Sequence, residues 1–277
     1  MMHSPQELFV FILIGFFLFL VGAIIGSFLH VLATRGKIGK SWISGRSECD
    51  ICHKKLRWFD MVPVLSFILL GGKCRFCNKK IATRHLLYEI TFGIVAVIWM
   101  GVAMYFYAPL DSLVTILQVL YWFLVLMVLG YIALVDFEEF IIPDGSVVIL
   151  VGSALLSLGY RSIVAQEGIQ DLVWSFMIAI VVTFGMFLLW YLTKGRGLGF
   201  GDVKLVLPLS LIVGWPGALV GVFLSFLIGA VVGVGLICVK KHAWKQPIPF
   251  GPFLILGFLL SVLFGSEIWG WYIQFLR

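Results

Sequence analysis

The sequence has little charge. Only 12% of its 277 residues are Asp, Glu, Lys or Arg, whereas 61% are hydrophobic and the mean hydropathy is +1.09. Soluble globular domains carry roughly 25% charged residues, so this class is excluded. The chain also lacks the alternating segments of about ten residues that build membrane β-barrels. Apolar runs near the ~20 residues that cross a bilayer recur instead, which predicts an all-α, multi-pass membrane protein.

No Lys or Arg precedes the first apolar run, Leu8 to Leu32. A signal peptide has a basic start and a shorter apolar core, so this run is expected to be a retained transmembrane helix. The sixth expected helix is short, and the Gly214-Trp215-Pro216-Gly217 break after it indicates a tight hairpin. The pattern predicts eight transmembrane helices over residues 8–32, 86–108, 113–135, 146–160, 172–193, 203–214, 216–239 and 250–275.

Positive charge is nearly missing from one side of this predicted topology. Twelve Lys or Arg lie between residues 35 and 84, three in 194–204 and three in 240–245, all on one face. The other face has only Arg161 and Arg277. The positive-inside rule makes the basic face cytoplasmic. Because topology explains the net charge of +6, nothing indicates a nucleic-acid partner.

Residues 33–85 form the one polar insert, a small cytoplasmic module between the first and second helices. It contains Cys49 and Cys52 in "CDIC" and Cys74 and Cys77 in "CRFC". Two Cys-x-x-Cys pairs at this spacing indicate a tetrahedral four-thiolate zinc site. Such a metal would supply much of the folding free energy of so small a module. Disulfides or idle thiols are the alternative, and a cytoplasmic location argues against disulfides.

The fifth cysteine, Cys238, lies in an apolar helix and is expected to be a packing residue. Other polar residues of the insert, including Asp60, Gly72 and Lys73, are consistent with turns and a solvated surface. Glu89 lies near the start of the second helix. An acid at that depth is costly unless paired, so Glu89 is either a site residue or an ion-pair partner of Arg84.

The only acidic cluster is "VDFEEFIIPDGS", which begins where the third apolar run ends. Asp144 in the Pro-Asp-Gly turn is a good candidate to cap the next helix. Glu138 and Glu139 are most simply a solvated loop. Asp136 directly follows the apolar run and is therefore expected at membrane depth.

On the same face, "GLGFGDVKL" places Asp202 after Gly199-Phe200-Gly201 at a helix start. The glycines give backbone freedom and open space for an approaching peptide, and the helix N-terminus favours an ionised Asp202. Two adjacent carboxylates do not both ionise readily, so one keeps a proton while the other activates water. Neither a Ser–His pair nor an H-E-x-x-H motif occurs. The alternative is that Asp202 only caps its helix.

Several motifs occur in an order that resembles the bacterial type IV prepilin peptidases, membrane aspartic proteases with a Gly-x-Gly-Asp motif. They span nearly the whole chain: "GSFLHV", the paired cysteines, "VPVLSF", "GGKCRFC", "RHLLYE", "VDFEEFIIPD", "GLGFGDVKL" and "PFGPFL". Two departures are His30 and His85, where that family usually has Asn and Tyr.

The resemblance implies a bifunctional enzyme of the bacterial inner membrane with its active site facing the cytoplasm. It would cleave the basic leader of prepilins or pseudopilins and then methylate the new N-terminus with S-adenosylmethionine. It maps the catalytic aspartates onto Asp136 and Asp202, and methyltransferase motifs onto Asp60, Gly72, Lys73 and Glu89. The implied organisation is a first helix (1–32), a zinc and methyltransferase module (33–85) and a peptidase domain (86–277).

Three alternatives remain at this point. A transporter or scaffold with a zinc-knuckle docking module would place polar residues mid-membrane, whereas the ionisable candidates gather at helix ends. A presenilin-type peptidase shares Gly-x-Gly-Asp but cuts within the membrane, which the zinc module and Asp136 argue against. A peptidase with an inactive methyltransferase module is the third.

Overall fold

The computed structural model describes residues 5–37, 47–49, 51–108, 111–239 and 248–276. Several basic residues used for the topology, Lys240, Lys241 and Lys245 among them, lie outside these ranges. The described chain is all-helical apart from two isolated β-bridges. It divides into two compact units, Met1–Met127 and Val128–Arg277. The helices are α1 (Pro5–Lys37), η1 (Trp58–Met61), α2 (Leu65–Leu69), α3 (Thr83–Tyr107), α4 (Leu113–Glu139), α5 (Asp144–Ile163), α6 (Ile169–Thr193), α7 (Phe200–Val213), α8 (Gly217–Cys238) and α9 (Gly251–Phe275).

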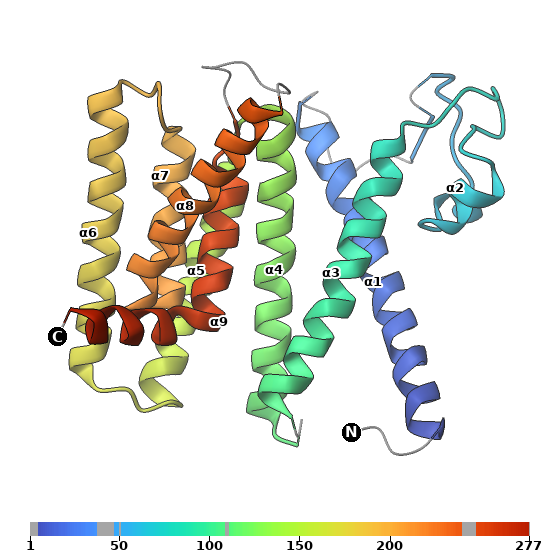
Figure 1. Cartoon of the computed structure of the whole chain (residues 1–277). Coiled ribbons are helices and arrows are strands. Elements are labelled where there is room, and N and C mark those ends of the chain that lie inside the picture. The colour runs from blue at the N-terminus through green and yellow to red at the C-terminus, as the bar shows by residue number, and fades with distance from the viewer. Residues whose placement is uncertain (1–4, 38–46, 50, 109–110, 240–247, 277) are drawn as a thin grey trace. The chain divides into compact units, whose positions relative to one another are not determined.

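The eight predicted long helices are all present, at nearly the predicted bounds (Figure 1). Seven are long and apolar enough to cross a membrane, so the protein is a multi-pass membrane protein. The exception is α7, whose 14 residues give a length of only about 21 Å. The predicted hairpin after it is also found, because α8 begins four residues after α7 ends.

In the first unit, α1 packs directly against α3. Glycine on one helix faces backbone on the other: a Cβ added to Gly26 would lie 2.7 Å from the Tyr88 carbonyl oxygen, and Gly22 contacts the carbonyl oxygen of Phe92. Gly93 of α3 is packed in turn against Phe19. In a membrane, where apolar burial gives little drive, such close backbone approach is what holds helices together.

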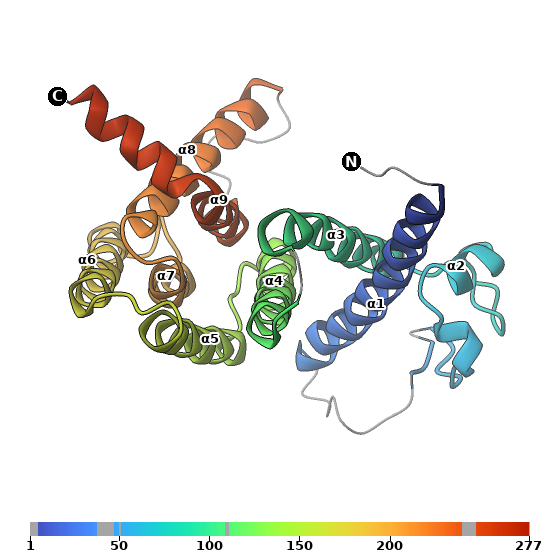
Figure 2. The same cartoon turned by 90° about the horizontal axis from the view of Figure 1, so that it is seen from below.

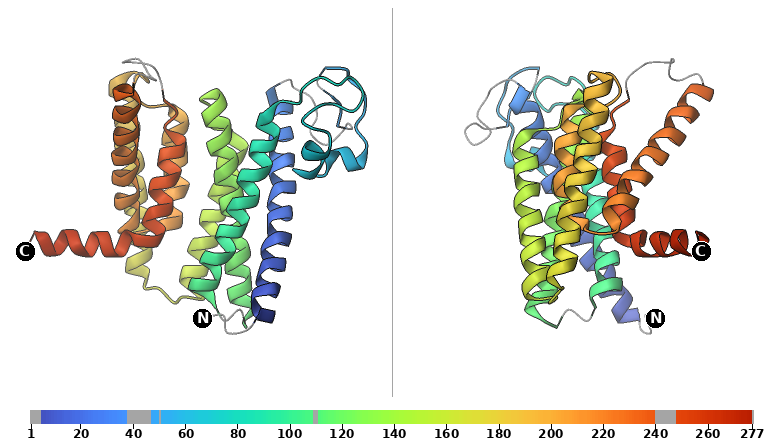
Figure 3. Two further views of the ribbon diagram at one scale, coloured as in Figure 1. Left: turned by 45° about the vertical axis from the view of Figure 1, so that its right-hand side comes forward. Right: turned by 90° about the vertical axis from the view of Figure 1, so that its left-hand side faces the viewer.

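In the second unit, α7 lies within the bundle, beside α5, α6, α8 and α9 (Figure 2). This central position explains why α7 is apolar over most of its length: nearly every residue from Asp202 to Ile212 is buried by protein. The helices alternate in direction, which places the α4–α5 connection, the α6–α7 connection and the start of α9 at the same end (Figure 1). The last part of α9 turns away from the bundle (Figure 3).

Arg161 secures the opposite end of this bundle. Its guanidinium group donates to both carboxylate oxygens of Glu167, at 3.0 and 2.8 Å, and to the Ser175 hydroxyl at 2.9 Å. The Trp215 N–H donates to the same hydroxyl at 3.4 Å. Arg161 and Ser175 therefore join the end of α5 and the start of α6 to the α7–α8 turn.

Candidate active site and metal centre

Asp136 lies in the last turn of α4, where the structure buries its side chain. The residue is 5% exposed, and its Oδ2 accepts a hydrogen bond of 2.9 Å from the Gly251 N–H at the start of α9. A Cβ added to Gly251 would lie 2.6 Å from that oxygen. Glycine is thus required at position 251 for the carboxylate to keep this place. In the sequence, Gly251 is part of the motif "PFGPFL", which does not reveal this contact with Asp136.

Asp202 lies in the first turn of α7 and is 6% exposed. Its Oδ2 accepts a hydrogen bond of 3.1 Å from the Gly199 N–H, which is the geometry of a helix-capping contact. The capping alternative is therefore correct as a description of the contact. It does not exclude a catalytic role, because the bond uses one carboxylate oxygen of two.

The two carboxylates are neighbours within the second unit. Asp136 lies in the last turn of α4 and Asp202 in the first turn of α7, at the same end of the bundle. The start of α7 also packs closely on the segment after α4, since a Cβ on Gly201 would lie 3.1 Å from that of Ile142. The structure thus brings together the two aspartates that the resemblance selected.

The other acids of the cluster behave differently. Asp144 is exposed and pairs with Lys204 at 2.7 Å. The prediction that Asp144 caps α5 is wrong: Pro143 is the N-cap and Asp144 is the first helical residue, with no side-chain capping bond. Glu138 and Glu139 are half-buried at the end of α4, so the prediction of a solvated loop is also wrong.

The four paired cysteines form a cluster that can hold a metal ion. Their sulfur atoms all lie within 4.8 Å of one another, and the Sγ atoms of Cys49 and Cys77 are 4.0 Å apart. Tetrahedral zinc with Zn–S bonds of ~2.3 Å requires sulfur separations of about 3.8 Å. The cluster therefore fits a four-thiolate zinc ion, with ligands Cys49, Cys52, Cys74 and Cys77.

Two matching turns build this cluster. In "CDICHKK" the N–H of His53 donates to the Cys49 carbonyl at 2.9 Å, and in "CRFCNKK" the N–H of Asn78 donates to the Cys74 carbonyl at 2.9 Å. Both His53 and Asn78 have positive φ, at 53° and 55°. The backbone N–H groups of Cys77 and Phe76 lower the pKa of the Cys74 thiol to about 7, which favours the thiolate that a metal needs. Cys238, by contrast, is exposed, so its predicted packing role is wrong.

The four methyltransferase candidates have internal contacts in the first unit. Asp60 Oδ1 binds Arg75 Nε at 2.9 Å, and Glu89 Oε2 accepts the Val64 N–H at 2.7 Å. The Gly72 N–H donates to the Phe67 carbonyl at 2.8 Å, at a φ of 67°. Lys73 has an exposed side chain, and its backbone forms an isolated antiparallel β-bridge with that of Lys80. These contacts join the candidates to the backbone and side chains of the module itself.

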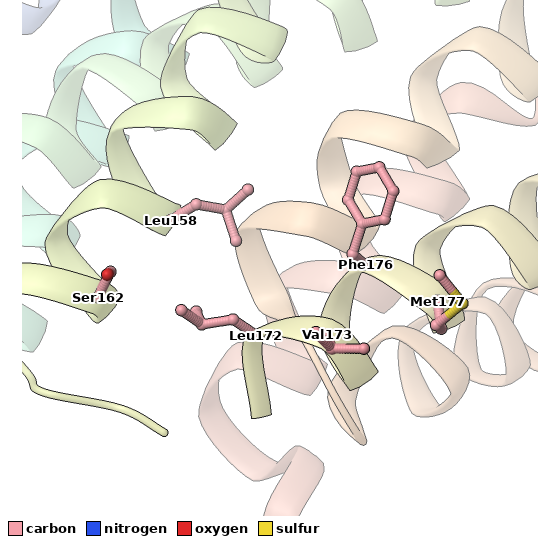
Figure 4. Close-up of a pocket in the computed structure, with 6 residues that line it drawn as sticks. All are labelled: Leu158, Ser162, Leu172, Val173, Phe176 and Met177. Atoms are coloured by element: carbon pink, nitrogen blue, oxygen red, sulfur yellow. The ribbon is translucent and has the colours of Figure 1, made fainter. Parts of the chain in front are cut away.

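An apolar pocket of about 380 Å³ lies between α5 and α6 (Figure 4). Its lining includes Leu158 near the end of α5 and Phe176 near the start of α6. Both aspartates lie at the other end of this bundle, because Asp136 ends α4 and Asp202 begins α7. The pocket therefore has no part in the carboxylate site.

Comparison with known proteins agrees with the motifs. Residues 20–103 match the bacterial peptidase A24 N-terminal domain, and residues 123–234 match the type IV leader peptidase family. A relative from Aeromonas hydrophila named prepilin leader peptidase/N-methyltransferase is 31% identical, over 82% of this chain and 74% of its own. The chain belongs to the type IV leader peptidase family.

With other relatives of the same name, the similarity extends over more of both chains. One from Pseudomonas aeruginosa is 26% identical over 92% of each chain, and one from Bacillus subtilis is 27% identical over 93% of this chain and 97% of its own. No solved structure matches the chain. Asp136 and Asp202 both fall within the stretch matched by the type IV leader peptidase family, and the four cysteines within the N-terminal match.

Proposed function

We propose that this protein is a membrane aspartic endopeptidase that removes the leader of type IV prepilins or pseudopilins and then methylates the new N-terminal amine. The observation that carries the peptidase assignment is the pair of buried carboxylates, Asp136 and Asp202, at one end of one helix bundle. The family and the names of its relatives, prepilin leader peptidase/N-methyltransferase, support the substrate and the second activity.

The catalytic pair would work as a carboxylate dyad. Two buried, neighbouring carboxylates share one proton, because the desolvated site does not hold two full negative charges. The ionised member takes a proton from water, whose oxygen attacks the scissile carbonyl carbon. The protonated member then gives its proton to the leaving amine nitrogen. Since Gly251 and Gly199 each hold an Oδ2 atom, the Oδ1 atoms are the ones that would face the water.

The acids around the pair also fit a cationic leader. Glu138 and Glu139 follow Asp136 by two and three residues at the end of α4, and their negative charge would attract a basic peptide segment. We place this site on the cytoplasmic face of the bacterial inner membrane, because the basic connections of the chain gather there. The apolar part of the substrate would stay in the bilayer.

The cysteine cluster would hold a structural zinc ion, which would supply folding free energy to the module and no step of the cleavage. The methyl donor would be S-adenosylmethionine. Asp60, Gly72, Lys73 and Glu89 are weak candidates for its site, because their contacts serve the module itself.

The experiment that tests the proposal is incubation of the purified enzyme in detergent with a prepilin, followed by mass spectrometry of the product N-terminus. A shortened chain with one added methyl group supports both activities. A shortened chain without the methyl group, when S-adenosylmethionine is supplied, identifies a peptidase with an inactive methyltransferase module. No cleavage without a further protein would contradict the peptidase assignment.

A further inference from the structure

The cysteine-bearing module has an exposed apolar surface that neither activity explains. Trp58, Ile68 and Leu69 are 75%, 66% and 78% exposed, and Met61 and Leu65 are also exposed. They lie on η1 and α2, outside the membrane-crossing helices. Large apolar side chains exposed together on two short helices that contact each other indicate an interaction site. These five residues are called the η1–α2 surface below.

A hydrogen bond sets the height of this surface relative to α3. Val64, the residue before α2, donates its N–H to Glu89 Oε2 at 2.7 Å. Glu89 lies six residues into α3, or about 9 Å along the helix axis from Thr83. The start of α2 is thus held alongside α3 and not beyond its end, and α2 lies beside the upper part of α3 (Figure 1).

This height corresponds to the edge of the bilayer. The 25 residues of α3 extend about 37 Å, whereas the hydrocarbon core is only ~30 Å thick. The first turns of α3 therefore lie among lipid headgroups, and a segment fixed about 9 Å along it is at or below their level. Tryptophan with neighbouring aliphatic residues is typical of this interfacial zone.

The charge of the module favours the same partner. Residues 48–85 contain eight Lys or Arg against three Asp or Glu. Basic residues close to a membrane surface bind anionic lipid headgroups. Both ends of the module continue into membrane-crossing helices, α1 and α3, so the module cannot move away from the bilayer.

We propose that the η1–α2 surface is a lipid-docking site, which inserts into the interfacial layer of the bilayer and binds anionic phospholipid. Glu89 is then a positioning residue, which holds Val64 and hence α2 at the correct depth. Val64 has a φ of 61°, an unfavourable conformation for a β-branched residue. The Glu89 bond holds the backbone in this turn. The docking would keep the metal-bearing module flat against the membrane.

The test measures depth and needs no turnover, so it is independent of the proposed activities. A nitroxide is attached to a ketone-bearing amino acid at position 69 of the full-length protein, in vesicles of phosphatidylcholine and phosphatidylglycerol. Collision with oxygen and with a water-soluble nickel chelate gives its depth. The label at position 69 should lie roughly 5–10 Å below the phosphate level, whereas a label at exposed Lys79 should contact the chelate freely.

Two outcomes would overturn the proposal. Equal access of the chelate to positions 69 and 79 would mean that the surface lies in water. Shielding of position 69 from both oxygen and chelate would mean that protein, such as a second copy of the chain, covers it. Vesicles of phosphatidylcholine alone should give a shallower label, and an unchanged depth would contradict the role of the basic residues.

A matched pair of variants tests Glu89. Glu89→Ala removes the acceptor of the Val64 N–H, so the label at position 69 should move toward the aqueous phase. Glu89→Gln keeps an acceptor oxygen and should leave the depth unchanged. A label that stays at its original depth in Glu89→Ala would show that α2 is positioned without this bond.

Discussion

At the scale of single residues, the site depends on backbone N–H groups that hold two acids. Asp136 and Asp202 each use Oδ2 to accept one N–H, from Gly251 and Gly199. Burial would otherwise make a charged carboxylate costly. One donor per acid stabilises the charged form while one oxygen stays available for chemistry.

Replacing either acid should therefore stop cleavage. Asn has nearly the shape of Asp and can still accept the glycine N–H, but it cannot transfer the proton. We expect Asp136→Asn and Asp202→Asn each to lower the cleavage rate by roughly 10²–10⁴-fold or more, with normal amounts of protein in the membrane. Prepilin processing by purified variants measures this.

The matched control is Asp144→Asn. Asp144 belongs to the same acidic cluster but is exposed and paired with Lys204. An exposed ion pair contributes little, so processing should stay near normal. Near-normal processing by Asp136→Asn or Asp202→Asn would rule out the dyad.

Gly251 is the residue whose importance only the structure shows. The Cβ of Gly251→Ala would lie 2.6 Å from Asp136 Oδ2, closer than real Cβ atoms approach, so the carboxylate would be displaced. Cleavage should fall strongly while the level of folded protein changes little. Gly145→Ala is the control, because an added Cβ there meets nothing within 4 Å. If both variants cleave equally well, Gly251 does not position Asp136.

These residues show what the sequence could predict. The sequence indicates Asp202 as a candidate site residue because it follows two glycines at a helix start. It indicates Asp136 because this residue ends an apolar run and lies in one of the ordered motifs. The Gly251 bond joins residues 115 positions apart, and no local pattern reports such a contact. The local turn pattern also led to a wrong prediction for Asp144. Its side chain does not cap α5 but forms an ion pair with Lys204 of α7.

At the scale of elements, the two cysteine turns and the two acids belong to different compact units. The turns lie within Met1–Met127, and both aspartates lie within Val128–Arg277. The helix bounds were predictable because apolar runs and breaks mark them directly. The short helix α7 is harder to predict from the sequence, because a helix that is buried by protein does not need the ~20 apolar residues of a lipid-facing span.

Loss of the metal should therefore affect the two activities unequally. Cys49→Ser removes one of four sulfur atoms that lie within 4.8 Å of one another, so the purified protein should lose the zinc ion that we propose for this cluster. Methylation should fall far more than cleavage, because the dyad lies in the other unit. Metal analysis and mass spectrometry of the product measure these effects.

The exposed Cys238 provides the control for this prediction. Cys238→Ser changes a thiol at the end of α8 that is not part of the cluster. It should leave metal content and both activities unchanged. Equal loss of cleavage and methylation in Cys49→Ser would show that the metal supports the whole fold.

At the scale of the whole molecule, alternating helix directions and basic connections determine which side of the membrane holds the site. The α6–α7 connection is at the same end of the second unit as Asp136 and Asp202, and the α5–α6 connection is at the opposite end. We expect the first to be cytoplasmic and the second external, because Lys194, Arg196 and Lys204 cluster near the former.

Cysteine labelling of intact cells tests this orientation. A membrane-impermeant thiol reagent should label Gln166→Cys, in the α5–α6 connection, and should not label Arg196→Cys, in the α6–α7 connection, until the membrane is opened. The unmodified protein serves as the control for background labelling. It should not be labelled in intact cells, because all five native cysteines are expected at the cytoplasmic face. Labelling of Arg196→Cys in intact cells would place the dyad outside, where a leader that stays in the cytoplasm could not reach it.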